Sequence, residues 1–390
     1  MILCAAAIVT LAMGVRQAFG LFLRPIAMDL EIGRQAFGLA IALQNLMFGL
    51  IQPFVGAWAD KHGAGKVILG GALLYVVGLG LTTLASGFLG LTVTLGGMVG
   101  LSMAGVTFVV VIGAVGRVVP AGKRTLAFGL ITAGGSVGQF LIVPAAQALL
   151  DALGWKGALF ALAGLIALIA PLALGLAGKP AMAANAEGPD LKGALAEASR
   201  DRSFWLLNLG FFVCGFHIAF VGTHLPAYIR DEGLSPSVGA GALALIGLFN
   251  IAGSWLWGAW AGKGSKKGLL ALLYGLRAVT IAVFMLAPLS PLSVLVFASA
   301  FGFLWLGTVP LTSGLVGQIY GVRHLSALFG IVFLSHQVGA FFGAWLAGLA
   351  YDATQSYSAM WIASILLALI AALASLPIRE QAIVRAPVPA

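Results

Sequence analysis

The chain has 390 residues, of which 61% are hydrophobic and only 8% are charged. A soluble globular protein carries about 25% charged residues, so this composition excludes a soluble enzyme and predicts a protein that crosses a membrane many times. The net charge of +9 does not indicate a nucleic-acid partner, because basic residues collect in the cytoplasmic loops of membrane proteins.

Apolar segments long enough to cross a lipid bilayer follow one another along the whole chain. About 20 apolar residues span a membrane as a helix. The polar stretch from Lys179 to Ser203 divides the segments six and six. The predicted domains are an N-terminal six-helix bundle at 1–178, a cytoplasmic linker with one short helix at 179–203, and a C-terminal six-helix bundle at 204–390. The twelve predicted spans are 2–23, 35–59, 66–87, 89–117, 124–150, 155–178, 204–229, 237–262, 267–288, 291–318, 324–350 and 357–377.

The basic residues of the predicted loops fall mainly on one side of the membrane. That side carries Lys61, Lys66 and the cations of the linker, among others. The opposite side carries only Arg24, Arg34, Lys156 and Arg230. Because basic loops stay in the cytoplasm, we expect both termini to be cytoplasmic. We also expect the protein to be a multi-pass monomer in the inner (plasma) membrane.

A short motif occurs at the same place in both halves of the chain. Gly56-Ala-Trp-Ala-Asp60-Lys61 follows the second predicted span, and Gly258-Ala-Trp-Ala-Gly262-Lys263 follows the eighth. Repetition at equivalent positions indicates that the two halves arose by duplication. Two parallel six-helix halves are one of the known plans of secondary transporters.

The longer segment Gly56-x-x-x-Asp60-Lys61-x-Gly63-x-x-Lys66 resembles the loop signature of the major facilitator superfamily. The resemblance implies that superfamily's fold, which is an all-α membrane protein with twelve transmembrane helices in two pseudo-symmetric bundles. Glycines allow helices to approach closely, and Asp60 at a helix end is expected to pair with cations. The residues predicted to form a conformational latch are Gly56, Asp60, Lys61, Gly63 and Lys66.

Two further segments resemble one branch of this superfamily. The segment from Gly134 to Pro144 is similar to the fifth-helix pattern of monocarboxylate porters, and the segment from Phe329 to His336 is similar to the eleventh helix of oxalate–formate antiporters. In those antiporters a substrate-binding lysine stands at the place of His336. Monocarboxylate porters also carry an arginine in the eighth helix, whereas the interior arginine of the C-terminal half here is Arg277, in the ninth span.

Four basic residues lie well inside predicted spans, whereas no acidic residue does; the four are Arg16, His217, Arg277 and His336. An arginine within hydrocarbon costs roughly 2.5–3.5 kcal/mol on insertion scales. Cationic groups without a carboxylate predict a small organic anion as substrate. Arg16 is predicted to bind a carboxylate with its guanidinium fork, with snorkelling to the membrane interface as the alternative. Arg277 either binds substrate too or is buried between helices against Tyr274 and backbone carbonyls.

Histidine titrates near neutral pH, so His336 and His217 are predicted both to bind substrate and to carry a coupling proton. The alternative for each is a hydrogen-bonded packing residue. Uncharged amides at mid-membrane depth either contact substrate or bridge helices. The amides predicted to bind substrate are Gln44, Asn45, Gln139 and Gln337.

The sequence contains no P-loop, hydrolase or kinase pattern and no Cys- or His-rich cluster, so no cofactor or metal is expected. The predicted function is secondary transport of monocarboxylates or short dicarboxylates by alternating access, coupled to protons or to a counter-anion. One alternative is a multidrug or metabolite exporter, although such carriers commonly use an intramembrane carboxylate that this sequence lacks. The other is a non-transporting receptor with a transporter fold.

Overall fold

The computed structural model describes residues 1–118, 121–177, 191–262, 264–321 and 325–383. Within these residues the regular structure is entirely helical, which confirms the predicted fold class. Large apolar side chains cover the outer surface; Leu3 and Leu286, for example, are 84% and 86% exposed. Such a surface suits lipid and not water, as expected of a multi-pass membrane protein. Residues 179–190 of the predicted linker lie outside the described residues.

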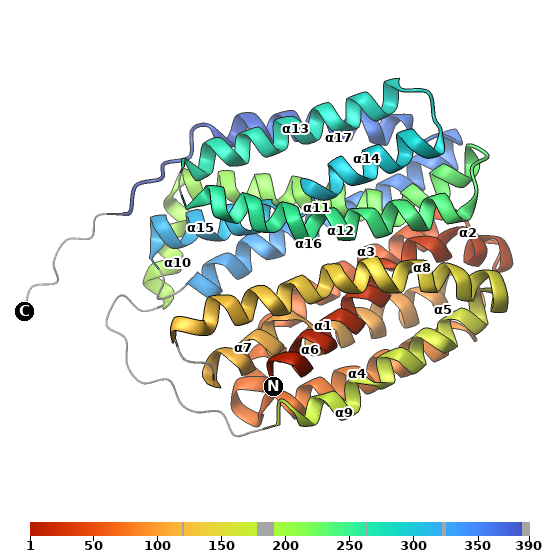
Figure 1. The fold of residues 1–390 in the computed structure, drawn as a ribbon, viewed down its shortest axis with the longest axis horizontal. Coiled ribbons are helices and arrows are strands. Elements are labelled where there is room, and N and C mark those ends of the chain that lie inside the picture. Colours follow the sequence, from red (N-terminus) through yellow and green to blue (C-terminus); the bar gives the residue numbers. More distant parts are fainter. Residues whose placement is uncertain (119–120, 178–190, 263, 322–324, 384–390) are drawn as a thin grey trace, which may run out of the picture.

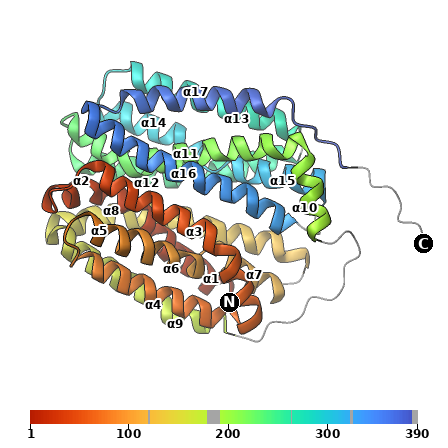
Figure 2. The ribbon, with the colours of Figure 1, turned by 180° about the vertical axis from the view of Figure 1, so that it is seen from behind.

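The helices form two groups that lie against each other along their length (Figures 1 and 2). The first group contains α1 Ile2–Gln17, α2 Phe19–Asp29, α3 Arg34–His62, α4 Ala64–Thr82, α5 Gly87–Leu91, a π-helix Thr92–Met98, α6 Val99–Val106, α7 Phe108–Val118, α8 Ala121–Ala167 and α9 Ile169–Leu174. The second contains α11 Arg202–Asp231, α12 Pro236–Ala261, α13 Lys266–Leu286, α14 Pro291–Phe303, α15 Thr308–Tyr320, α16 Leu325–Thr354 and α17 Ser358–Ser375. The short α10 Leu191–Arg200 precedes α11.

The helical spans differ from the predicted ones in how they are joined. Ten segments of the described residues are long and apolar enough to cross a membrane, and α1 with α2, bent by 40°, makes an eleventh. The segment Leu130–Leu174 has 45 residues, about twice what one crossing needs. It turns at Gly154, whose φ of 67° suits glycine. The predicted spans 124–150 and 155–178 are therefore joined without a loop, and counting both gives twelve.

Two further spans, besides the bent pair α1–α2, contain breaks in their α-helix. In the first group, the span Gly87–Ile112 contains the π-helix and leaves helical geometry at Thr107, before α7 begins. In the second group, the span Pro291–Tyr320 is broken between α14 and α15. Broken helices at membrane depth are tolerated where other protein groups satisfy the freed backbone. Such breaks often lie beside the binding site of a transporter.

The two groups meet mainly through α3 against α16, α8 against α12, and α2 against α11. Small residues bring the backbones close. On α3, a Cβ atom at Gly49 would overlap the Gln337 side chain of α16. We call the end of the molecule with α10 and the α12–α13 turn the linker end. The opposite end, with the α2–α3, α11–α12 and α16–α17 turns, is the far end (Figure 1).

Candidate functional site

Arg16 is the penultimate residue of α1, just before the bend into α2. Its Nη2 donates a hydrogen bond to the side-chain oxygen of Asn45 on α3, and its guanidinium carbon lies 5.8 Å from the centre of the Phe48 ring. The Asn45 amide group donates in turn to the Ile41 carbonyl at 2.8 Å. Arg16 therefore turns inward toward α3. No carboxylate of the described residues lies within ion-pair distance of it.

His336 lies on α16 across the contact between the two groups. The Phe48 and Phe333 rings pack edge to face at 6.0 Å, and Phe333 stacks on the His336 ring at 5.6 Å. His336 Nδ1 is hydrogen-bonded to Gln337 Oε1 at 3.0 Å, and the Gln337 side-chain nitrogen is buried without a partner. Arg16 and His336 thus lie on opposite sides of one aromatic pair.

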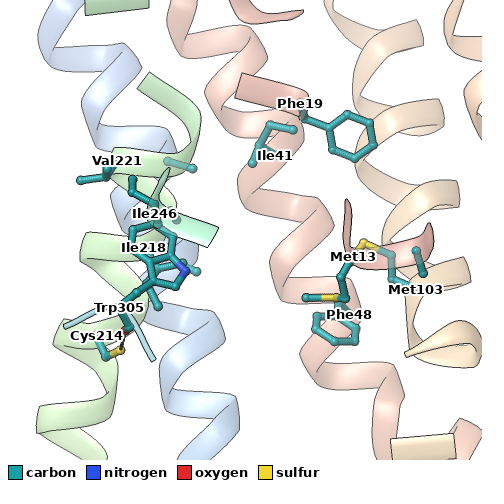
Figure 3. Close-up of a cluster of buried hydrophobic side chains, with 14 of the residues drawn as sticks. Met13, Phe19, Ile41, Phe48, Met103, Cys214, Ile218, Val221, Ile246 and Trp305 are labelled. Atoms are coloured by element: carbon teal, nitrogen blue, oxygen red, sulfur yellow. Dashed lines mark hydrogen bonds between the residues drawn. The ribbon is translucent and has the colours of Figure 1, made fainter. Parts of the chain in front are cut away.

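These contacts define a central site at the interface of the two groups, formed by Arg16, Asn45, Phe48, Phe333, His336 and Gln337. The first three come from the N-terminal group and the others from the C-terminal group. The site combines a guanidinium, a titratable ring and a buried amide donor, and within the described residues the guanidinium has no carboxylate partner and the amide donor no hydrogen-bond partner. Such donors favour an anionic ligand. Figure 3 shows Met13 and Phe48 on one side of this region and Cys214, Ile218 and Trp305 on the other.

The remaining predicted amides are engaged in helix–helix bonds. Gln44 donates from α3 to the Leu95 carbonyl of the π-helix at 3.0 Å, inside the N-terminal group. Gln139 on α8 accepts from Gln17 at 3.2 Å and donates to the Leu243 carbonyl of α12 at 2.8 Å. Gln139 therefore joins the two groups through a hydrogen bond that links α8 to α12.

Arg277 lies inside the C-terminal group. It is fully buried on α13, and its Nη2 donates to the Leu304 and Trp305 carbonyls at 2.5 and 3.0 Å. These two carbonyls belong to the break between α14 and α15, and its guanidinium carbon is 5.4 Å from the centre of the Tyr274 ring. Arg277 is thus buried against Tyr274 and backbone carbonyls, and its contact with substrate stays a prediction. The Nε and Nη1 atoms of Arg277 have no partner.

His217 is also buried inside the C-terminal group. Its Nε2 is 2.9 Å from the Ser364 carbonyl of α17, and its Nδ1 has no partner. Nearby, the Cys214 thiol contacts the Thr308 hydroxyl at 3.1 Å. These residues, with Arg277, form a polar layer behind the broken span. Among the hydrogen bonds and ion pairs of the described residues, none joins Arg277 or His217 to Arg16.

Asn250 and Trp305 are further polar side chains that contact or form the break in the tenth span; from the sequence, Asn250 either bridges helices or contacts substrate, and Trp305 is a packing residue. Asn250 on α12 accepts from the Leu306 N–H at 3.0 Å and donates to Ser136 of α8 at 2.9 Å, so it joins the break to the N-terminal group. Trp305 is 1% exposed, and its indole N–H has no partner. The sequence contains a signal for this break, because Gly307 and Pro310 lie near the middle of the span and both residues disfavour a continuous helix.

The predicted latch lies at the linker end, at the turn from α3 to α4. Gly63 has a φ of 92°, a backbone conformation that favours glycine, and this explains the glycine of the motif at this turn. Gly56 lies in α3, and Lys66 is exposed at the start of α4. The side chains of Asp60 and Lys61 lie outside the described residues, so the predicted pairing of Asp60 with cations stays a prediction.

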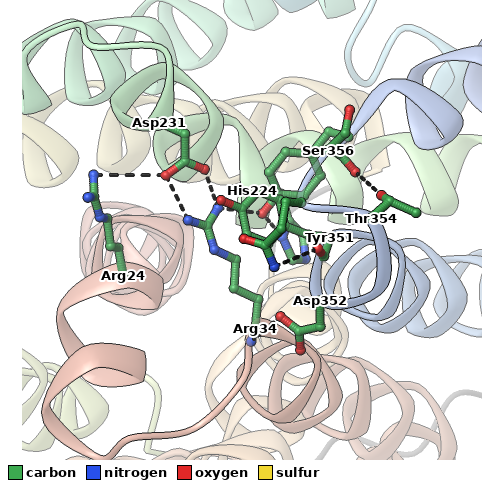
Figure 4. Close-up of polar contacts among 10 residues, drawn as sticks. Arg24, Arg34, His224, Asp231, Tyr351, Asp352, Thr354 and Ser356 are labelled. Carbon is green, nitrogen blue, oxygen red and sulfur yellow. Dashed lines mark hydrogen bonds and ion pairs between the residues drawn. The ribbon is translucent and has the colours of Figure 1, made fainter.

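A cluster of charged residues joins the two groups at the far end (Figure 4). Arg34, at the start of α3, binds Asp231 of α11 through two hydrogen bonds of 2.5 and 2.7 Å, and its guanidinium carbon lies 3.6 Å from the centre of the Tyr351 ring. Asp352 of α16 accepts from the Arg34 and Gln35 backbone N–H groups at 3.0 and 2.8 Å. It thereby caps α3 from the other group. These residues lie in the predicted loops or at the ends of the predicted spans, and none was predicted as a site residue.

We call Arg34, Asp231, Tyr351, Asp352, Tyr357 and His224 the far gate. Its ion pair links helices of opposite groups, so the far end cannot open without breaking it. Among the residues that the structure describes, no group of three or more His, Cys, Asp or Glu residues is suited to hold a metal ion.

Comparisons with known proteins give the family context of this arrangement. The model of the Major Facilitator Superfamily matches residues 3–316. Monocarboxylate transporter 13 of Rattus norvegicus is 28% identical over 371 residues, which cover 90% of this chain and 82% of that protein. The oxalate:formate antiporter of Oxalobacter formigenes is 23% identical over 341 residues, which cover 85% of this chain and 80% of that protein.

The same fold occurs in a solved structure. A bacterial homolog of the human lysosomal transporter Spinster, crystallised in an inward-facing and occupied conformation, matches with a TM-score of 0.76 at 18% identity. The match covers 96% of this chain and 95% of that one. The family and the relatives are membrane transporters and not enzymes.

Proposed function

The chain belongs to the Major Facilitator Superfamily, and from this premise we propose that it transports small organic anions, namely monocarboxylates or short dicarboxylates, by alternating access. The membrane is the inner (plasma) membrane, with both termini in the cytoplasm, as the Lys and Arg asymmetry of the loops favours. The linker end then faces the cytoplasm and the far end faces outside.

The observation that carries this proposal is the environment of Arg16. Its guanidinium lies inside the bundle with one amide partner and no carboxylate of the described residues at ion-pair distance. A charge at membrane depth is costly and is rarely kept without a use. A guanidinium binds a carboxylate through two parallel hydrogen bonds, so a carboxylate substrate supplies the missing counter-charge.

His336 and Gln337 would contact the other end of the substrate. They come from the C-terminal group, whereas Arg16 comes from the N-terminal group, so a bound anion would connect the two halves that must move. A protonated imidazole adds a second positive charge for the anion. Proton and anion would then raise each other's affinity by the same factor, which gives proton symport, whereas a permanent charge would favour anion exchange.

Arg277 and His217 are assigned a supporting role in this proposal. Arg277 satisfies the carbonyls freed at the break between α14 and α15, and so holds the backbone at Trp305 in place. His217 ties α11 to α17. Both act on the site through the helices that they position, without touching the substrate.

Flux measurements test the proposal directly. Purified protein in proteoliposomes should take up labelled lactate, oxalate or formate, and uptake should rise as the pH on the far side falls. His336→Gln should weaken binding most at acid pH, and His336→Lys should keep binding but lose most of the pH dependence. His62→Gln is the matched control, since His62 is exposed at the linker end. Absence of flux for all three anions in folded protein would refute the anion assignment.

A further inference from the structure

A buried histidine of the far gate links its Arg34–Asp231 ion pair, through Tyr357, to the backbone of α16. His224 lies on α11, seven residues before Asp231, and is fully buried. Its Nε2 is 2.8 Å from the Ala344 carbonyl, and its Nδ1 is 3.0 Å from the Tyr357 hydroxyl. The same hydroxyl oxygen accepts from Arg34 Nη1 at 3.0 Å. A chain of hydrogen bonds therefore runs from the Arg34–Asp231 ion pair through Tyr357 and His224 to the backbone of α16.

The chemistry of the partners fixes where the protons lie. A backbone carbonyl can only accept, so His224 Nε2 must carry the proton that it shares with Ala344. The Tyr357 oxygen accepts from Arg34, and a tyrosine phenol is protonated at neutral pH. Its proton is therefore available for His224 Nδ1, which accepts it in the neutral ring. The closed gate is built around an uncharged His224.

A second proton on His224 would disrupt this arrangement. Nδ1 would become a donor, so the Tyr357 proton would lose its acceptor, and a second positive charge would lie one phenol away from Arg34. The charged and titratable groups around His224 are Arg24, Arg34, Tyr228, Asp231, Tyr351, Asp352 and Tyr357.

The carboxylates of this cluster are not available to pair with a charged imidazolium. Both oxygens of Asp231 bind Arg34, and both oxygens of Asp352 accept from the backbone at the start of α3. Neither of these two carboxylates is therefore free to pair with a charged His224.

We propose that His224 is a proton-sensitive positioning residue of the far gate, whose neutral ring holds the gate closed and whose charged ring opposes closure. Because His224 is fully buried when the gate is closed, a proton from the far side reaches it only after a transient opening and then keeps the open state populated. Closing the gate releases the proton, by the same linkage. The inference rests on the proposed function only in requiring that the far end opens during transport.

A distance measurement on purified protein tests this without any organic anion. Spin labels are placed at Met28→Cys on α2 and Ala359→Cys on α17, both exposed at the far end, in a Cys4→Ser background in which Cys214 stays buried. The distance distribution is recorded from pH 8 to pH 5. We expect the longer, gate-open distance to grow several-fold in population as the pH falls.

Three variants decide which residue is responsible. His224→Gln can still donate to Ala344 and accept from Tyr357, so it should keep the short distance at every pH. Asp231→Asn should raise the open population at every pH, and Tyr357→Phe should reduce the pH dependence. His62→Gln, at the linker end, should behave as the wild type.

Two results would overturn the inference: a wild-type distance that does not respond to pH, or a pH response that survives in His224→Gln. Neither result bears on whether the protein carries organic anions, which the flux measurements decide. Conversely, a protein that transports none of the three anions could still show the pH-dependent gate.

Discussion

The central site and the far gate each contain an arginine from the N-terminal group, but the two arginines have opposite surroundings. Arg34 has a bidentate carboxylate, a phenol and an aromatic ring, all from the C-terminal group. Arg16 has one amide from its own group and the face of Phe48. A guanidinium that is paired with a carboxylate of the protein holds parts of the protein together. A guanidinium at membrane depth without a carboxylate partner is free to bind a ligand.

This difference implies that the far gate and the central site have different functions, closure and ligand binding. The far gate contributes to closure without any substrate, because its charges are already paired. The central site depends on what enters it, because its positive charge lacks a negative partner among the described residues. Substitutions should therefore separate the two regions by their readout: affinity for Arg16, and conformation or stability for the gate.

Arg277 belongs to neither region, and its substitution is expected to have the largest effect on stability. In Arg277→Leu the carbonyls of Leu304 and Trp305 lose their donor, and leaving a buried polar group unsatisfied costs about 1–3 kcal/mol each. We expect a large fall in folded yield and in the thermal unfolding midpoint. Anion affinity of the surviving protein should change less than threefold; a selective loss of affinity at normal stability would show that Arg277 binds the substrate.

Arg16→Gln should have the converse profile. Loss of a hydrogen bond to a charged group costs about 1.5–3 kcal/mol, which is roughly a 10- to 150-fold weaker Kd. The thermal midpoint should not fall, because an uncompensated charge is removed. Arg16→Lys should restore only part of the affinity, since an ammonium lacks the planar fork. The Kd of the transported anion is measured at equilibrium for the wild type, Arg16→Gln and Arg16→Lys. An unchanged Kd in Arg16→Gln would show that Arg16 does not bind the substrate.

Asp352→Ala probes the gate with a smaller effect. Its carboxylate caps α3 from the other group, and loss of a helix cap costs about 0.5–2 kcal/mol. The thermal midpoint of the variant should fall accordingly. Asp29→Ala is the matched control, because Asp29 pairs with Lys156 on a half-exposed surface, and such pairs contribute about 0–1 kcal/mol. Equal effects of the two substitutions would argue against a specific role of the cap.

The last prediction concerns orientation and should leave function almost unchanged. A cysteine at Lys266, near the linker end, should react with an impermeant thiol reagent only from the cytoplasm. A cysteine at Glu232, beside the far gate, should react only from outside. Labelling of both positions from the same side would contradict the assignment of the far gate to the outer surface.

The site was only partly accessible to sequence reasoning. Arg16, Asn45, His336 and Gln337 could be chosen because charge and amides stand out inside apolar spans. Arg277 and His217 stood out for the same reason, yet they lie in the polar layer behind the broken span. Composition cannot distinguish a substrate-binding charge from a structural one, because a ligand, a carboxylate or the carbonyls freed at a helix break can each compensate a buried charge.

The sequence by itself determined that this is an all-helical membrane protein and that its halves repeat. These properties follow from local composition and length, since any run of about 20 apolar residues can cross a bilayer. Only the tertiary structure decided which charges are satisfied. Arg34 and Asp231 are 197 positions apart, so their pairing depends on how the two groups of helices pack. His224 and Tyr357 are 133 positions apart and meet through the packing of helices within the C-terminal group. The packing of the two groups leaves Arg16 without a carboxylate partner among the described residues, and this makes it the strongest candidate to bind the substrate.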